Sequence, residues 1–327
     1  MGGPWGHYTG PIDRTWPAYV NATGRQKQLF AKVALHPRVS WFTETTSVDR
    51  LPEALGGYIH NMQKGNPDAL VQFALFRQWP RGELNRHIPL TAEEQAAYRH
   101  WIDTAVATIG NARALIVLEP DLALDAPGRR GLKTADPAVR LSLVRYAAQR
   151  LAQLPRATVY LEAGAPDWLK PWRATRLLID AGIAYTEGFA LGGTHHTSVG
   201  ADVDYAWKIR NQLAARGYPN KRVVLDTADN GRPFTFQQYR RKYPRAPFIT
   251  PVMCKTKREK RCNTLGVPPT TRVTAYRRKL GTNARQQARL GAIVDAFVWM
   301  GRPWRGNNGA HFSPTRLLKA ARTTPFQ

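Results

Sequence analysis

Short runs of apolar residues alternate along the chain with longer segments in which apolar residues recur every three or four positions. The short runs are continuously apolar, which is typical of parallel strands buried on both faces. The longer segments have the period of helices with one buried face. The predicted strands are residues 32–35, 69–76, 112–118, 158–161, 184–191, 222–225 and 296–300.

Helix boundaries are marked by residues that satisfy free backbone groups. Thr91 and Glu94 form a capping box, and the apolar positions that follow end at Gly110. Asp136 before Pro137 predicts another helix start, and residues 204–216 form a further amphipathic segment. Alternating strands and helices predict an α/β fold with one parallel sheet, open or closed into a barrel. No repeat or linker divides residues 1–327, so we expect a single domain.

Composition narrows the class of protein. Hydrophobic residues make up 43% of the chain, which excludes a disordered protein. The longest strongly apolar run, residues 114–118, is far shorter than the roughly 20 residues that span a membrane. The chain has 48 Lys and Arg against 23 Asp and Glu, a net charge of +25. Such a surplus suggests nucleic acid, an anionic membrane surface or an acidic polymer as a partner.

The basic residues do not have the pattern of an RNA-binding sheet. They gather at 240–242, 255–261 and 277–279, without interleaved aromatic residues. A nucleic-acid-binding protein therefore stays a competing class that rests on charge alone. Ten Trp residues are the second unusual feature, because Trp is generally buried or stacked on a ligand.

Acidic residues follow three of the predicted strands directly. Asp121 comes after the strand at 112–118, Glu162 after that at 158–161, and Asp226 after that at 222–225. A single acid in such a place often only caps a helix or closes a turn. Three in succession favour a site, because parallel α/β folds place their chemistry at the carboxyl ends of strands. Carboxyl pairs beside Trp residues are typical of glycoside hydrolysis.

Several segments resemble glycoside hydrolase family 6, the secreted cellulases and cellobiohydrolases. Residues 115–121, Leu-Ile-Val-Leu-Glu-Pro-Asp, resemble the family's Val-Leu-Glu-Pro-Asp. Residues 160–169, Tyr-Leu-Glu-Ala-Gly-Ala-Pro-Asp-Trp-Leu, are similar to its Tyr-Leu-Asp-Ala-Gly-His-x-x-Trp-Leu. The remaining similar segments follow in the same order, namely Gly-Phe-Ala at 188–190, Asp-Thr-Ala-Asp-Asn-Gly at 226–231, Cys-Asn-Thr-Leu-Gly-Val-Pro-Pro-Thr at 262–270 and the last strand at 295–299.

This resemblance implies a distorted parallel β/α barrel of about seven strands. It also implies inverting hydrolysis of β-1,4-glucan or a related cell-wall polysaccharide, without metal or cofactor. Asp121 falls on the family's general acid, and Asp226 on an acid that shapes the central subsites. Trp168 falls on a sugar platform on the leaving side, and Trp41 fits an N-terminal stacking aromatic less specifically.

Departures from the family pattern concern the catalytic base. Residues 301–309 replace the family's Lys-Pro-Gly-Glu-x-Asp-Gly loop and contain no carboxylate. We rank Glu83 first as a substitute, with Glu162 and Asp229 as the other acids nearby. Asp229 itself stands where the family has Arg, and Arg261 replaces a Trp. A carbohydrate-binding pseudoenzyme without a base is therefore the alternative to an endo-acting hydrolase.

Aromatic and polar residues near the strand ends are the candidate binding residues. His195 and its neighbour His196 are expected to form hydrogen bonds at the rim or fill the core, because no metal-ligand spacing accompanies them. Trp79 and Trp304 lie in departing loops and are expected to remodel the donor-side subsites. The full set is Trp41, Trp79, Glu162, Trp168, Trp172, His195, Asp229, Asn230, Trp299, Arg302 and Trp304. An open cleft is expected from the loops at 122–136 and 300–312.

Cys254 and Cys262 are eight residues apart, which suits neither a CxxC redox motif nor a zinc site. From the residues alone, a local disulfide and two free thiols are equally good interpretations. The resemblance favours the disulfide and an exported protein that begins at Met1 after removal of a leader. We therefore expect a monomer that binds a polysaccharide, with no nucleic-acid partner and no membrane span.

Overall fold

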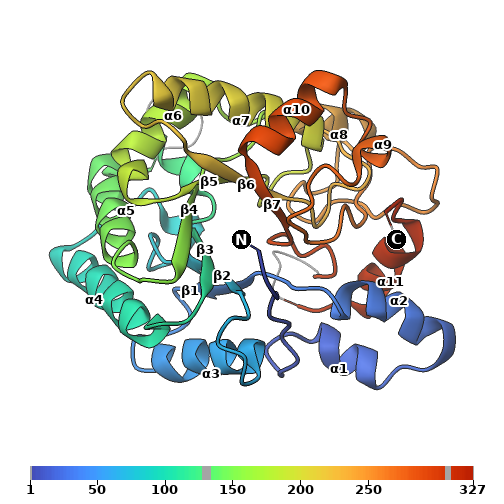
Figure 1. Ribbon diagram of the computed structural model, residues 1–327, viewed down its shortest axis with the longest axis horizontal. Helices are drawn as coiled ribbons and strands as arrows, with labels where there is room; N and C mark the ends of the chain where they lie inside the picture. Colours follow the sequence, from blue (N-terminus) through green and yellow to red (C-terminus); the bar gives the residue numbers. More distant parts are fainter. Residues whose placement is uncertain (1, 127–133, 306–310, 327) are drawn as a thin grey trace.

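The computed structural model describes residues 2–126, 134–305 and 311–326. Seven parallel strands form one sheet in the order β1-β2-β3-β4-β5-β6-β7, and helices surround the curled sheet (Figure 1). The expected parallel β/α barrel of about seven strands is thereby confirmed. The strands are β1 (Ser40–Thr43), β2 (Val71–Phe76), β3 (Ala114–Leu118), β4 (Ala157–Glu162), β5 (Gly188–Leu191), β6 (Arg222–Asp226) and β7 (Val294–Val298).

Helices alternate with the strands and flank them at both ends of the chain. The α-helices are α1 (Thr15–Val20), α2 (Gly24–Ala34), α3 (Leu51–Gln63), α4 (Ala92–Ile109), α5 (Pro137–Leu151), α6 (Pro171–Asp180), α7 (Val199–Ala214), α8 (Phe236–Lys242), α9 (Arg277–Leu280), α10 (Ala284–Ile293) and α11 (Pro314–Thr323). Short 3-10 helices are η1 (Glu83–Asn85), η2 (Leu122–Asp125) and η3 (Ile183–Tyr185).

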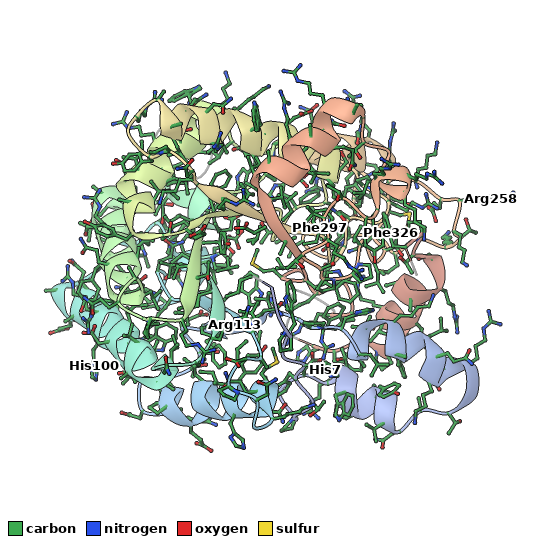
Figure 2. All side chains as sticks on the ribbon, in the orientation of Figure 1. His7, His100, Arg113, Arg258, Phe297 and Phe326 are labelled. Atoms are coloured by element: carbon green, nitrogen blue, oxygen red, sulfur yellow. A yellow bond between two sulfur atoms is a disulfide. The ribbon has the colours of Figure 1, made fainter. Side chains whose placement is uncertain are left out.

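The two faces of the sheet carry different cores because successive strand residues point to opposite sides. Phe73, Ile116 and Phe189 belong to the large core shared with the helices. Ala74, Val117 and Tyr160 belong to a smaller cluster made almost entirely of strand residues, which fills the inside of the barrel. In Figure 2, Phe297 lies inside the ring of helices, whereas Arg258 lies at its edge, as expected for a charged side chain.

The barrel is joined across a seam between β1 and β7. Among the described residues, no strand ladder pairs these two strands. Single hydrogen bonds cross the seam instead: Val39 N–H donates to the Trp299 carbonyl at 2.9 Å, and Trp41 Nε1 donates to the Met300 carbonyl at 3.0 Å. The seam therefore places the start of β1 beside the segment that follows β7.

Several expectations about elements require correction. Residues 32–35 do not form a strand: 32–34 are the end of α2, and the first strand is β1. Their apolar side chains belong to the buried face of a helix, because Leu29, Phe30, Val33 and Ala34 are all buried. Asp136 precedes α5 as expected, but its side chain makes no capping hydrogen bond because its backbone is left-handed. The capping box of α4 and its end at Gly110 are confirmed.

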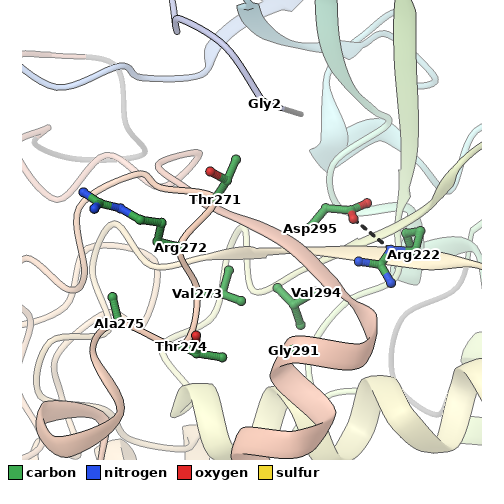
Figure 3. Close-up of a pocket in the computed structure, with 10 residues that line it drawn as sticks. All are labelled: Gly2, Arg222, Thr271, Arg272, Val273, Thr274, Ala275, Gly291, Val294 and Asp295. Carbon is green, nitrogen blue, oxygen red and sulfur yellow. Dashed lines mark hydrogen bonds and ion pairs between the residues drawn. The ribbon is translucent and has the colours of Figure 1, made fainter.

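A cavity of about 520 Å³ lies at the amino end of the sheet, opposite the predicted acids (Figure 3). Its charged residues Arg222 and Asp295 form an ion pair at 2.8 Å, and Tyr160 also donates to Asp295. The three side chains therefore satisfy one another's hydrogen-bonding groups and link β4, β6 and β7. Within the described residues, no helix is both long and apolar enough to cross a membrane.

Candidate active site

The carboxyl ends of the strands bring several acids to one edge of the barrel. Tyr160 and Val224 point inward, so Glu162 and Asp226, two residues further along each strand, also point inward. Asp121 follows β3 and is half-buried in a left-handed backbone conformation with φ 66°. This conformation is uncommon outside glycine and concentrates at functional sites.

Glu162 and Asp121 lie beside each other. Glu162 is fully buried, and burial followed by the negative charge of Asp121 raises its pKa well above the usual value. The backbone N–H groups of Gly164 and Asp121 oppose this effect only in part. Each of these two carboxyl groups therefore makes ionisation of the other less favourable.

Asp226 is anchored by the backbone of the loop after β7. Its Oδ1 accepts from the N–H groups of Ala228 and Met300, both at 3.0 Å, and its Oδ2 accepts from Gly301 at 2.7 Å. Burial, then the charge of Asp229, raises the pKa of Asp226 to about 8, against the effect of the three N–H groups. Asp226 thus ties the end of β6 to the end of β7.

Asp229 is more accessible than Asp226 and is paired with a histidine. Its side chain is 13% exposed, and its Oδ1 lies 3.3 Å from Nδ1 of the buried His196. Burial lowers the pKa of His196, but the carboxylates of Asp229, Asp226 and Asp167 outweigh it and raise the pKa. A methyl group on Gly301 would lie 2.8 Å from Asp226 Oδ2 and 3.2 Å from Asp229 Oδ2. Both carboxylates therefore approach the start of the β7 loop.

Glu119 is a structural residue that the strand-end pattern alone does not distinguish from the acids of the site. Its buried carboxylate accepts from the N–H groups of Arg77 and Gln78 and from the Tyr98 hydroxyl at 2.8 Å. These hydrogen bonds connect the loop after β2 to the end of β3. Glu119 therefore holds the turn that carries Asp121.

Trp168 lies close to the loop of Asp121. Gly164 has φ 77°, and a Cβ there would come within 3.1 Å of Ala123 and 3.3 Å of Trp168, so this turn requires glycine. The ring of Trp168 stacks on that of His195, with the ring centres 4.6 Å apart. His195 Nε2 lies 3.9 Å from Asp167. The histidine thus supports the aromatic residue expected to bind sugar.

Trp41 lies on the other side of the edge, at the seam. The ring of Phe76 contacts it edge-on at 5.6 Å. The guanidinium of Arg302 lies 4.5 Å from the centre of the Trp41 ring. Arg302 therefore covers part of the Trp41 ring, which was expected to stack on a sugar.

Three of the Trp residues expected to stack on substrate are buried. Trp299 is 0% exposed, Trp79 is 2% exposed and Trp304 is 4% exposed, so these three side chains pack inside the protein. Trp299 donates to the Val267 carbonyl at 2.7 Å and packs in the core with Trp304. Trp172 is 51% exposed on α6, where Arg173 covers its ring.

Two polar expectations also change. Asn230 is 7% exposed and donates to the Thr197 carbonyl, so it holds two loops together. Glu83, ranked first as a substitute base, is exposed in η1. Partial burial of its carboxyl group raises the pKa of Glu83, against the effect of the positive charge of Arg86.

Parts of the two loops expected to shape the cleft, within 122–136 and 300–312, lie outside the described residues. Elsewhere in the chain, no three His, Cys, Asp or Glu side chains are arranged to hold a metal ion. The Cys254–Cys262 disulfide is present.

The sequence model described as Glycosyl hydrolases family 6 matches residues 6–305. The chain belongs to this family. Among curated family 6 relatives, Endoglucanase A of Cellulomonas fimi is 26% identical over 227 residues, 69% of this chain and 47% of that protein. Endoglucanase 1 of Streptomyces halstedii is 27% identical over 216 residues, 66% of this chain and 65% of that protein. The chain thus matches about half to two thirds of the length of these relatives.

A solved family 6 structure has the same fold over almost the whole chain. It is the endoglucanase Cel6 from Mycobacterium tuberculosis in complex with methyl-cellobiosyl-4-deoxy-4-thio-β-D-cellobioside. The TM-score is 0.75 at 23% identity, covering 99% of this chain and 98% of that one.

Proposed function

We propose that this protein is an endo-acting glycoside hydrolase that cleaves β-1,4-linked glucan or a related cell-wall polysaccharide with inversion, with Asp121 as the general acid. The observation that carries this proposal is the half-buried Asp121 beside the buried Glu162, at the carboxyl edge of a family 6 sheet. The names of the curated relatives, both endoglucanases, support the substrate class.

The reaction needs a proton donor on one side of the bond and a proton acceptor on the other. Asp121 gives its proton to the glycosidic oxygen as the bond from that oxygen to the anomeric carbon breaks. A water molecule attacks the anomeric carbon from the opposite face and loses a proton to a carboxylate. Exchange with solvent then restores both groups. Asp226 is poorly suited to accept this proton, because both of its oxygens are held by backbone N–H groups.

We assign the acceptor to Asp229 rather than Glu83. Asp229 is partly exposed, and its Oδ1 lies 3.3 Å from Nδ1 of His196. Its carboxylate also approaches Gly301 at the start of the loop after β7, where the family motif carries acids that this chain lacks. In this assignment the carboxylate that accepts the proton comes from the loop after β6 instead of the loop after β7. The protein then has a base, unlike the pseudoenzyme alternative.

We further propose that the protein is exported and acts as a monomer on an extracellular polysaccharide. The Cys254–Cys262 disulfide supports export, because such bonds persist in oxidising compartments. The basic residues gather in short exposed segments such as 240–242, without the interleaved aromatic residues of an RNA-binding sheet, so we assign no nucleic-acid partner.

The test is hydrolysis of neutral and substituted β-glucans, with the anomer of the first product followed by NMR. We expect inversion, and Asp121→Asn should lower turnover by roughly 10²–10⁴-fold. The loss should be small on an aryl glycoside whose leaving group needs no proton. A retained anomer, or an Asp121→Asn variant as active as the parent, would contradict the proposal. Binding without turnover by the parent protein would identify a pseudoenzyme.

The base is tested with Asp229→Ala and the matched variant Glu83→Ala. Asp229→Ala should lose most turnover, and azide should restore it, because azide attacks without giving up a proton. Glu83→Ala should retain the parent rate. The reverse result for the two variants would return the role to Glu83.

A further inference from the structure

A second polar cavity lies in the seam between β1 and the segment after β7. Its volume is about 180 Å³, several times the roughly 30 Å³ that one water occupies in the liquid. Trp41 and Arg302 line it, together with Arg38, Arg305 and Asp13. It therefore adjoins the aromatic residue that the sequence offered as a sugar platform.

The side chains that line this cavity include more basic than acidic residues. Three arginines and one aspartate line it. Asp13 is engaged by Arg38, whose Nε donates to its Oδ2 at 2.5 Å. Burial, and then the positive charge of Arg305, lowers the pKa of Arg302 to about 9. Asp121, Asp13 and Asp226 oppose this shift without cancelling it.

Arg38, one of the residues that line this cavity, carries a buried hydrogen-bond donor. The residue is only 5% exposed, and its Nη1 donates to the carbonyls of Val33 and His36. Among the described residues, its buried Nη2 has no acceptor. A buried guanidinium nitrogen without an acceptor is costly, so an oxygen-rich group in the cavity would be stabilising.

Arg302 is held in a geometry that suits an anion. Its planar guanidinium lies over the Trp41 ring, and Trp41 is fixed by its hydrogen bond to the Met300 carbonyl. Stacking leaves the edge of a guanidinium, where its N–H groups point, open to a carboxylate or sulfate. Residues 301–309 contain two arginines and no acid, so the sequence of this loop is itself basic.

We propose that this seam cavity binds a negatively charged substituent of the polysaccharide, a uronic acid carboxylate or a sulfate ester, so that the substrate is an anionic β-glycan. The inference rests on the proposed hydrolase function, and it adds the class of sugar to it. Arg302 and Trp41 together form the binding surface: the ring supports the guanidinium, and the guanidinium contacts the anion.

The experiment compares three oligosaccharides of equal length: a neutral cello-oligosaccharide, one carrying C6 carboxylates and one carrying sulfate esters. We expect kcat/KM at least tenfold higher for one of the anionic substrates than for the neutral one. The preference should shrink in 0.5 M NaCl, because salt screens charges. Whichever anionic substrate is preferred identifies the substituent.

Variants separate the cavity from the overall charge of +25. Arg302→Gln should lower kcat/KM on the preferred anionic substrate by roughly 10-fold or more and abolish the preference over the neutral one, as expected for loss of a charge-assisted hydrogen bond. Arg305→Gln should act in the same direction. Arg176→Gln removes the same charge from an exposed position, 71% exposed on α6, and should leave the preference intact.

Binding measurements keep this inference distinct from the proposed reaction. Calorimetry with the Asp121→Asn variant should show tighter binding of the anionic oligosaccharide, and Arg302→Gln in that background should remove the difference. If no substrate is cleaved but this binding difference appears, the hydrolase proposal fails and the anionic site stands. Equal affinity and equal kcat/KM for neutral and anionic substrates would overturn the anionic site.

Discussion

Replacing Asp226 by asparagine changes one buried oxygen at the point where β6 and β7 end. Asparagine can keep one oxygen in the place of Oδ1, where it accepts from Ala228 and Met300. Its amide nitrogen then faces the N–H group of Gly301, which loses its acceptor. Because Asp226 is only 3% exposed, water cannot replace that acceptor. We expect a cost of about 1–3 kcal/mol that does not depend on pH.

The parent protein has an additional, pH-dependent cost that asparagine removes. The pKa of Asp226 is raised from 3.8 to about 8 in the folded state. Its contribution to stability is therefore complete below about pH 4 and is lost as the pH rises toward 8. Each pH unit in this window costs about 1.4 kcal/mol for a single group. Because Asp226 shares its environment with Asp229, we expect a loss of about 2–4 kcal/mol between pH 5 and pH 8.

The two effects have opposite consequences at the two ends of this window. Asp226→Asn should be less stable than the parent at pH 5 and about equally or more stable at pH 8. The measurement is the free energy of unfolding in urea at pH 5, 6.5 and 8, followed by Trp fluorescence. Asp180→Asn, at a half-exposed position on α6, is the matched control and should track the parent. Parallel pH profiles for Asp226→Asn and the parent would refute the reasoning.

Two further predictions concern stability. Replacing both Cys254 and Cys262 by alanine opens a short loop and should lower the free energy of unfolding by about 2–3 kcal/mol. The measurement is urea unfolding with and without reductant. An unchanged midpoint of the urea transition would contradict a stabilising disulfide. Trp299→Ala removes a side chain that is 0% exposed and should lower the free energy of unfolding by about 3–5 kcal/mol. Trp172→Ala, at a position that is 51% exposed, should change it by no more than about 0.5 kcal/mol. Similar Tm values for the two variants would show that Trp299 is not part of the core.

Local patterns predicted the elements best where the signal lies within one segment. The capping box of Thr91 and Glu94 and the end of α4 at Gly110 depend on residues a few positions apart, and both are present. The prediction of a strand at 32–35 was wrong because a short apolar run has no periodicity that distinguishes a buried piece of helix from a strand. The inward direction of Glu162 and Asp226 follows from strand alternation once the inner face is known.

The sequence by itself determined the parallel α/β architecture, the placement of acids after the strands and the similarity to family 6, because these depend on alternation, periodicity and order along the chain. Only the tertiary structure decided which Trp residues are exposed, that His196 pairs with Asp229, and that Arg302 lies on Trp41. These contacts join separate strands, and the hydrogen bond from Trp41 to Met300 spans 259 positions. No local pattern encodes them: His196 and Asp229 meet because β5 and β6 are neighbours in the sheet, and Arg302 meets Trp41 because the curled sheet brings its first and last strands together.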